Sequence, residues 1–438
     1  MGKKRVIILG AGLAGLSTAW HLQKQGIDCQ LFEQEEEVGG LCRSKKIEGF
    51  TFDYSGHLLH FRSDYAFKLV KDLLGGNLVE HKRSSWVYSH GAYNRYPFQA
   101  NLYGLPSAVI KECVLGFISA SKNKHPAGNK NRDFLSWIEQ SFGSGIARHF
   151  MIPYNTKFWT VPLKRLTCEW LDGFIPVPSL SELIDGALKK SRRQVGYNSH
   201  FWYPKQGGIA ELPKAIAAEV KNIHLKSEVT GIELGKREIK LAGAGREKFD
   251  YLISTLPLPE MARLIKNIPP AVAISFKKLR WNSILNLNLG ISGRDNHNRH
   301  WAYFSQEDLS FFRVGFFHNF SPDMAPEGRG ALYAEISYSK DRPLNKSAIA
   351  LRVAADLKKV GLRKDGDAIF LQDIVDIKYG YPIYDTEYGQ RRAEILEYLR
   401  SRNVLSCGRY GSWRYMSMED VLLEGKTILE RLSGKKCV

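Results

Sequence analysis

The chain has 438 residues, 44% of them hydrophobic and 12% aromatic, a composition typical of a folded globular protein and not of a disordered one. A chain of this length is longer than a single hydrophobic core usually accommodates, so two or three domains are expected. The formal net charge of +18 favours anionic partners, which include small anionic molecules, membrane surfaces and nucleic acid, although a basic surface can also serve solubility alone.

The first forty residues predict a strand, a glycine turn, a helix and a second strand. Residues 6–9 (VIIL) are fully apolar, as in a buried parallel strand, and residues 29–32 predict the second strand. Between them Gly10, Gly12 and Gly15 form G-x-G-x-x-G. The first glycine permits a tight turn, the second lets the backbone approach a pyrophosphate, and the third lets the helix pack on the strand.

This segment predicts a dinucleotide site. The helix that starts at Leu13 and Ala14 would direct its free N–H groups and positive dipole end towards the phosphates. Glu33 closes the second strand roughly 20 residues after the glycines, where its carboxylate can accept from a ribose hydroxyl.

Later segments are expected to return to the same sheet. A helix over 212–220 is followed by predicted strands over 224–229 and 251–255. Near the C-terminus, residues 405–409 predict a strand and a turn, and 419–433 predict a helix with an apolar stripe.

Two insertions interrupt this pattern. Residues 100–200 have helical periodicity around 134–138, whereas 280–340 alternate as antiparallel strands do. The expected fold class is α/β, with three parts: a discontinuous Rossmann-like nucleotide domain (1–95, 203–260 and 400–438), a mainly helical domain (96–202) and an antiparallel-sheet substrate domain (261–399). We expect the ligand cleft between them.

A second glycine motif follows Glu33. Residues 37–44 (EVGGLCRS) resemble the motif found in the FAD superfamily of amine oxidases, protoporphyrinogen oxidases, phytoene desaturases and UDP-galactopyranose mutases. The resemblance implies tightly bound FAD, with Gly39, Gly40 and Leu41 along its pyrophosphate and ribityl chain. It also implies that Arg43 contacts a phosphate or the flavin; the alternative is a solvated surface arginine.

Six blocks, in order along the chain, resemble the UDP-galactopyranose mutases, particularly the eukaryotic branch. They are GFTFDYSGH (49–57), YPFQANL (96–102), PYNTKFWTVP (153–162), WAYF with the following FR (301–313), GYPIY (380–384) and GRYGSWRY (408–415).

The mutase resemblance implies specific roles for residues in these blocks. Gly56 and His57 would lie beside the isoalloxazine ring, with His57 responding to the flavin redox state; a structural histidine is the alternative. Catalytic roles fall to His57, Arg313, Tyr381 and Tyr415, the last three near the substrate diphosphate. Further cofactor contacts would be Val229, Gly408, Arg409, Ser412 and Trp413, and further substrate contacts Tyr96, Phe98, Asn101, Asn155, Trp159, Trp301 and Tyr303.

Arg313 interrupts an aromatic strand, FFRVGFF (311–317). A buried unpaired charge is costly, so its guanidinium needs a partner, and the candidates are a substrate phosphate, a carboxylate or bulk water. The resemblance favours the phosphate.

Two departures affect the substrate side. The mutases carry a diphosphate-binding arginine in W-L-x-x-R, where this chain has Phe174, and their asparagine-glutamine-aspartate-histidine run is replaced by MSMED (416–420). Phenylalanine offers no bidentate fork. Replacement charge is expected from Lys157, Lys205, Arg409 or Arg414.

The leading functional hypothesis is an FAD-dependent mutase that contracts the ring of a nucleotide sugar through a flavin N5–sugar adduct. The alternative is an FAD-dependent oxidoreductase that removes hydride from an amine, a porphyrinogen or a polyene, and a non-catalytic FAD scaffold stays open. The expected partner is a small anionic substrate, with NAD(P)H as an electron donor left open, as is peripheral membrane contact.

Several classes are not expected. No stretch approaches the roughly 18 apolar residues of a membrane span, and the glycine-interrupted start is unlike a signal peptide. Six scattered cysteines without a C-x-x-C pair argue against zinc and disulfides and favour the cytoplasm. Nucleic-acid-binding motifs, Walker loops and Ser-His-Asp groupings are not apparent, so no nucleic-acid partner and no metal are expected.

Overall fold

The computed structural model describes residues 4–122, 132–171, 175–189, 199–294 and 297–433. Phe174, which stands where the mutases have an arginine, lies outside the described residues, as does most of the polar segment 121–132.

The nucleotide sheet is parallel and has five strands in the order β19-β13-β1-β2-β9. Its strands are β1 (Val6–Leu9), β2 (Cys29–Phe32), β9 (Ile223–His224), β13 (Tyr251–Ser254) and β19 (Val404–Ser406). All four residues of β1 are buried, because the strand has a neighbour on each side and helices on its faces. The prediction of an α/β fold with a parallel, Rossmann-like nucleotide sheet is confirmed.

Helices from three separate parts of the chain pack around this sheet. They are α1 (Leu13–Lys24), α2 (Asp64–Leu74), α7 (Glu211–Ala218), the short α12 (Gly408–Gly411) and α13 (Met418–Ser433). The first and last helices cross closely, since a Cβ on Gly425 would lie 2.5 Å from Ser17 Oγ. The turn expected after β19 is therefore the helical turn α12.

The strand predicted over 224–229 is wrong in its extent. Only β9 joins the parallel sheet, because Lys226 adopts φ +53°, a left-handed conformation that ends the strand. Val229 begins a separate antiparallel sheet of β10 (Val229–Glu233), β11 (Glu238–Leu241) and β12 (Arg246–Lys248).

A seven-stranded sheet forms the middle of the molecule, in the order β18-β14-β17-β16-β15-β6-β7. Its strands are β6 (Ser85–Ser89), β7 (Ala92–Arg95), β14 (Trp281–Ile291), β15 (Trp301–Phe304), β16 (Arg313–Phe316), β17 (Gly330–Tyr338) and β18 (Ile369–Pro382). The antiparallel strands expected over 280–340 are present. However, β15 pairs in parallel with β6, so residues 85–95 continue this sheet although we grouped them with the nucleotide domain.

Shorter elements surround the two large sheets. The two-stranded pairs are β3 (Ser44–Ile47) with β4 (Phe50–Asp53), and β5 (Leu78–Lys82) with β8 (His200–Pro204). Further helices are α8 (Leu258–Leu264), α9 (Pro270–Lys277), α10 (Ile349–Lys359) and α11 (Tyr388–Arg400).

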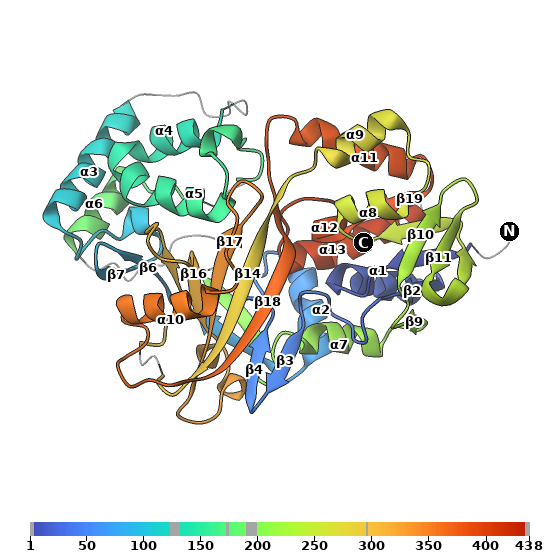
Figure 1. Ribbon diagram of the computed structural model, residues 1–438, viewed down its shortest axis with the longest axis horizontal. Helices are drawn as coiled ribbons and strands as arrows, with labels where there is room; N and C mark the ends of the chain where they lie inside the picture. The colour runs from blue at the N-terminus through green and yellow to red at the C-terminus, as the bar shows by residue number, and fades with distance from the viewer. Residues whose placement is uncertain (1–3, 123–131, 172–174, 190–198, 295–296, 434–438) are drawn as a thin grey trace.

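A helical unit lies beyond the seven-stranded sheet. It contains α3 (Ser107–Lys122), α4 (Phe134–Ile146), a π-helical turn (Ala147–Met151), α5 (Ile152–Trp159) and α6 (Leu180–Leu188). In Figure 1 this unit and the nucleotide sheet lie at opposite ends of the long axis, with the seven-stranded sheet between them.

Among the residues that the structure describes, no helix combines the length and the apolar composition needed to cross a bilayer. The five cysteines in these ranges, Cys29, Cys42, Cys113, Cys168 and Cys407, are free thiols.

Candidate functional site

The glycine cradle, which we define as Gly10, Gly12, Gly39 and Gly40, joins the two glycine motifs. Gly39 N donates to the Ala11 carbonyl over 2.8 Å, and a Cβ on Gly40 would stand 3.1 Å from Gly12 Cα. A Cβ on Gly12 would meet only Gly40 Cα, at 3.8 Å, so this face is open to a ligand. The expected approach of backbone to a pyrophosphate fits this geometry.

The other glycines of the first motif serve packing, as their spacing predicts. A Cβ on Gly15 would lie 1.9 Å from the Gly10 carbonyl oxygen, and Gly10 itself adopts φ +94°. Leu13 and Ala14 open α1 behind Gly12, which provides no side-chain cap. Backbone N–H groups at this end thus have capacity for an anion.

Acidic and basic side chains flank the cradle. Glu33 Oε2 accepts from Ala11 N over 2.7 Å, which fixes its carboxylate against the first turn. Arg43 donates to the Gly40 carbonyl over 2.8 Å and to Glu35 over 3.3 Å, and lies 4.7 Å from the Tyr54 ring centre. The predicted flavin or phosphate contact of Arg43 stays a prediction.

The C-terminal turn packs against the start of α1, next to the glycine cradle. Gly408 has φ +77°, and a Cβ there would lie 2.5 Å from Ala14 Cβ, so α12 rests directly on α1. Glu424 of α13 accepts from Gly408 N and, over 2.9 Å, from Ser412 Oγ. Trp413 is buried behind this turn.

His57 lies in the turn after β4. Its Nδ1 is within hydrogen-bonding distance of the Ser55 carbonyl, at 3.2 Å. Burial, together with the positive charge of Arg409, lowers the pKa of His57 to about 4, so the imidazole is neutral at pH 7.

A tyrosine cluster, which we define as Tyr96, Tyr154, Tyr303, Tyr381 and Tyr415, brings together four of the predicted substrate residues. The Tyr381 and Tyr415 rings stack with centroids 5.9 Å apart, and Tyr303 lies 5.2 Å from Tyr96 and 5.6 Å from Tyr154. Phe158 links the two groups, at 4.7 Å from Tyr381 and 6.3 Å from Tyr154. Trp159 also reaches Tyr381, at 6.0 Å.

Arg409 enters this cluster from α12. Its guanidinium carbon lies 4.5 Å from the Tyr381 ring centre and 4.9 Å from that of Tyr415. It donates to the carbonyls of Met416 and Gly380, but its Nε is buried without a partner, and within the described ranges no carboxylate pairs with it. A buried guanidinium with a free donor can bind an anionic or electron-rich ligand.

Of the three partners considered for Arg313, the structure shows a carboxylate, whereas the resemblance favours a substrate phosphate. Its NH2 donates to Glu335 Oε1 over 2.7 Å and its Nε to Oε2, across the β16–β17 pair. Burial alone would lower the pKa of Arg313, but the Glu335 charge raises it well above its ordinary value. The pair lies at the cluster, where Arg313 interacts electrostatically with Tyr154, Tyr303 and Tyr415.

Other predicted contacts lie in the surrounding packing. Phe98 stacks on Phe150, and the amides of Asn101 and Asn155 donate to the Pro97 and Met151 carbonyls. Trp301 is buried beside Phe201, and Leu41 packs on an apolar group that contains Ile284 and Phe312. The substrate contacts expected of Phe98, Asn101 and Asn155 stay predictions.

Of the four candidate replacement charges, only Arg409 reaches the cluster. Buried Lys157 donates to the Gln306 carbonyl over 2.7 Å, Arg414 pairs with Glu424 at 3.4 Å, and Lys205 is exposed. The sequence interpretation missed Ser55, Tyr154 and Glu335. A single acid in the apolar strand ALYAEISY (331–338) was the available signal for Glu335.

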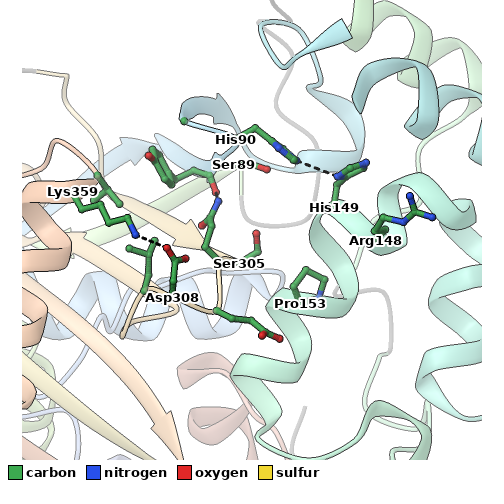
Figure 2. A pocket seen from close by; sticks show the side chains of 14 residues that line it. Ser89, His90, Arg148, His149, Pro153, Ser305, Asp308 and Lys359 are labelled. Carbon is green, nitrogen blue, oxygen red and sulfur yellow. Dashed lines mark hydrogen bonds and ion pairs between the residues drawn. The ribbon is translucent and has the colours of Figure 1, made fainter. Parts of the chain in front are cut away.

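A separate cavity of about 330 Å³ lies between the helical unit and the seven-stranded sheet. Figure 2 shows His90, in the β6–β7 turn, facing His149 of the π-helical turn, with Asp308 and Lys359 on the opposite wall. His90 Nε2 and His149 Nδ1 are 3.2 Å apart. None of the lining residues belongs to the glycine cradle or the tyrosine cluster.

Comparison with known proteins settles the family. The family model for flavin-containing amine oxidoreductases matches residues 13–428. The chain belongs to this family. It is therefore an FAD-dependent flavoenzyme, and the open face of Gly12 and the unpartnered Nε of Arg409 fit such a cofactor.

Individual members of the family differ in what they do. The chain is 22% identical to coproporphyrinogen III oxidase of Bacillus subtilis over 82% of its length and 83% of that protein. It is 34% identical to 4,4'-diapolycopene oxygenase of Methylomonas sp. over 60% of its length and 58% of that protein.

Among solved structures, reduced UDP-galactopyranose mutase superposes with a TM-score of 0.94 and 27% identity, covering 99% of this chain and 94% of that one. Wild-type putrescine oxidase with bound putrescine gives a TM-score of 0.66 at 16% identity, covering 99% of each chain, and this likeness shows the fold alone.

Proposed function

We propose that this flavoenzyme isomerises the sugar of a nucleotide sugar, in the manner of a UDP-galactopyranose mutase. The observation that carries the proposal is that two arginines, Arg409 and Arg313, lie beside the tyrosine cluster, where a substrate would meet the predicted flavin. The likeness to reduced UDP-galactopyranose mutase over almost the whole chain supports it.

In this proposal the protein binds and orients the substrate. Burial raises the pKa of Tyr415 to about 12, so its phenol stays protonated and can donate to a diphosphate oxygen. The positive charge of Arg409 beside Tyr381 and Tyr415 would attract the diphosphate, and Tyr381 would pack on the nucleotide. Bound FAD, once reduced, supplies a nucleophilic ring nitrogen, and the buried aromatic walls exclude water from it.

The test uses FAD-loaded protein reduced with dithionite and a panel of UDP-, dTDP- and GDP-sugars. We expect one sugar to yield a ring isomer that chromatography separates, with its nucleotide intact. Tyr415→Phe should slow this conversion, whereas Tyr398→Phe, a buried tyrosine on α11, should not. A panel in which no sugar is isomerised by fully reduced protein would contradict the proposal.

A second candidate is an oxidoreductase, favoured by the finding that Glu335 already balances the charge of Arg313. The aromatic side chains would then enclose an apolar substrate, whose hydride passes to FAD and onward to oxygen or a quinone. Oxygen consumption, or reduction of an added quinone, with amines, porphyrinogens and polyenes distinguishes the two functions, because an isomerase reduces neither acceptor.

A further inference from the structure

Two buried side chains, Ser55 and Glu335, connect the His57 turn to Arg313. Ser55 Oγ donates to Glu335 Oε1 over 2.5 Å, and Arg313 NH2 donates to the same oxygen over 2.7 Å. Ser55 and Glu335 are only 8% and 3% exposed, so direct hydrogen bonds and not water make this link. Two donors therefore share one carboxylate oxygen.

Ser55 also holds the imidazole of His57. Its carbonyl oxygen lies 3.2 Å from His57 Nδ1, while its hydroxyl reaches across to β17 of the seven-stranded sheet. Ser55 thus contacts both His57, the predicted neighbour of the flavin, and the Glu335 carboxylate that binds Arg313.

The turn is fixed on both sides of Ser55. Before it, the Asp53 carboxylate accepts from Ser44 Oγ over 2.6 Å and from the Tyr203 hydroxyl over 2.7 Å. After it, a Cβ on Gly56 would stand 2.0 Å from the Tyr333 hydroxyl oxygen. A shift of this turn consequently has to move Ser55 relative to Glu335.

We propose that Ser55 is a positioning residue that couples the His57 turn to the anion-binding capacity of Arg313 through Glu335; its effect on nucleotide binding rests on the proposed function. The Ser55 hydroxyl takes up part of the acceptor capacity of Glu335 Oε1. Without it, Glu335 binds Arg313 alone and holds the guanidinium more strongly, which leaves less of its donor capacity for a phosphate.

The experiment is a double-mutant cycle of Ser55→Ala and Glu335→Gln in FAD-loaded protein. Its two readouts are the dissociation constant of UDP by calorimetry and the midpoint potential of the bound flavin. Ser55→Ala should weaken UDP binding roughly threefold to tenfold, the scale of one neutral hydrogen bond, and shift the potential. In the Glu335→Gln background it should add no further change to either quantity.

Two further variants separate coupling from simple damage to the fold. Ser55→Thr keeps a hydroxyl and should restore both readouts towards the wild type. Ser275→Ala is the matched control, because Ser275 is buried and donates to the Glu394 carboxylate over 2.5 Å in the α9–α11 region. It should leave UDP binding and the potential unchanged.

Additive effects of Ser55→Ala and Glu335→Gln on the potential would overturn the coupling. Failure of wild-type protein to bind UDP would instead count against the proposed function, and the potential cycle would still decide whether Ser55 acts through Glu335. If Ser55→Ala does not fold, Ser55→Cys, whose thiol is only a weak donor, takes its place in the cycle with Glu335→Gln.

Discussion

The glycine cradle and the tyrosine cluster face the same predicted cofactor but draw on the chain differently. The cradle comes from residues 10–40, joined by the adjacent strands β1 and β2. The tyrosine cluster takes its side chains from near residues 96, 154, 303, 381 and 415, which meet only when three parts of the fold have assembled. Local spacing is therefore enough to describe the first, whereas the second depends on tertiary packing.

The largest expected effect tests the cradle. Gly12→Val should abolish FAD binding, because the added side chain would occupy the open face while meeting only Gly40 Cα within the protein. The measurement is the visible absorbance of co-purified flavin, with reconstitution by added FAD. Gly76→Val is the control, since no atom lies within 4 Å of a Cβ at that position. A yellow Gly12→Val protein would remove the cradle from the cofactor site.

The next prediction tests the edge of the tyrosine cluster. Arg313→Ala should lower the free energy of unfolding by about 3–5 kcal/mol, because it leaves the Glu335 carboxylate buried without its cation. It should also weaken nucleotide-sugar binding by roughly 1.5–3 kcal/mol, while FAD stays bound. Denaturant unfolding and calorimetry measure the two effects.

A paired variant sharpens that prediction. Adding Glu335→Gln to Arg313→Ala should recover part of the stability, since no buried charge then lacks a partner. Nucleotide-sugar binding should not recover with it. Unchanged stability in Arg313→Ala alone would mean that water reaches Glu335.

A smaller, pH-dependent effect concerns the stability of the protein around His300, which lies just before β15. His300 Nδ1 accepts from Ser84 N over 2.9 Å, and burial together with the neighbouring His81 lowers the pKa of His300 to about 3. A depressed pKa means that this stability is complete above pH 6.5 and is lost as the pH falls towards 3, at about 1.4 kcal/mol per pH unit. Between pH 7 and pH 5, the thermal stability of His300→Asn should fall less than that of the wild type. An equal fall in both proteins would contradict the assignment to His300.

The smallest effect concerns the surface of the cradle. Arg43 pairs with Glu35, whose side chain is 46% exposed, so Arg43→Ala should change the free energy of unfolding by less than about 1 kcal/mol. Loss of bound flavin in this variant, measured as for Gly12→Val, would support the predicted phosphate or flavin contact. Retention of flavin at wild-type stoichiometry would mean that Arg43 serves only its contacts within the protein, with Gly40, Glu35, Glu37 and Tyr54.

The sequence predicts the cradle almost residue by residue because the glycine spacing and the flanking apolar strands are local signals. It predicts that Arg313 needs a partner, but the choice of Glu335 depends on the register between β16 and β17, which no short motif contains. The mutase resemblance also implies that Asn155 contacts the substrate, which stays a prediction, and its amide donates to the Met151 carbonyl one turn earlier. Phe158 and Tyr154 are ordinary helix residues by pattern, and only packing reveals them as the link within the cluster.

The central position of β1 also sets an order of events during synthesis. Its neighbour β13 lies some 240 residues later, and the α12 turn against Ala14 comes from the last part of the chain. A nascent chain that ends before Val404 therefore has the glycine motif but neither the β19 edge of the sheet nor the helix α13 that covers α1. Because such long-range pairings form slowly, the flavin site is completed late, and until β19 is in place the outer edge of β13 is unpaired and exposed to chaperones or to aggregation.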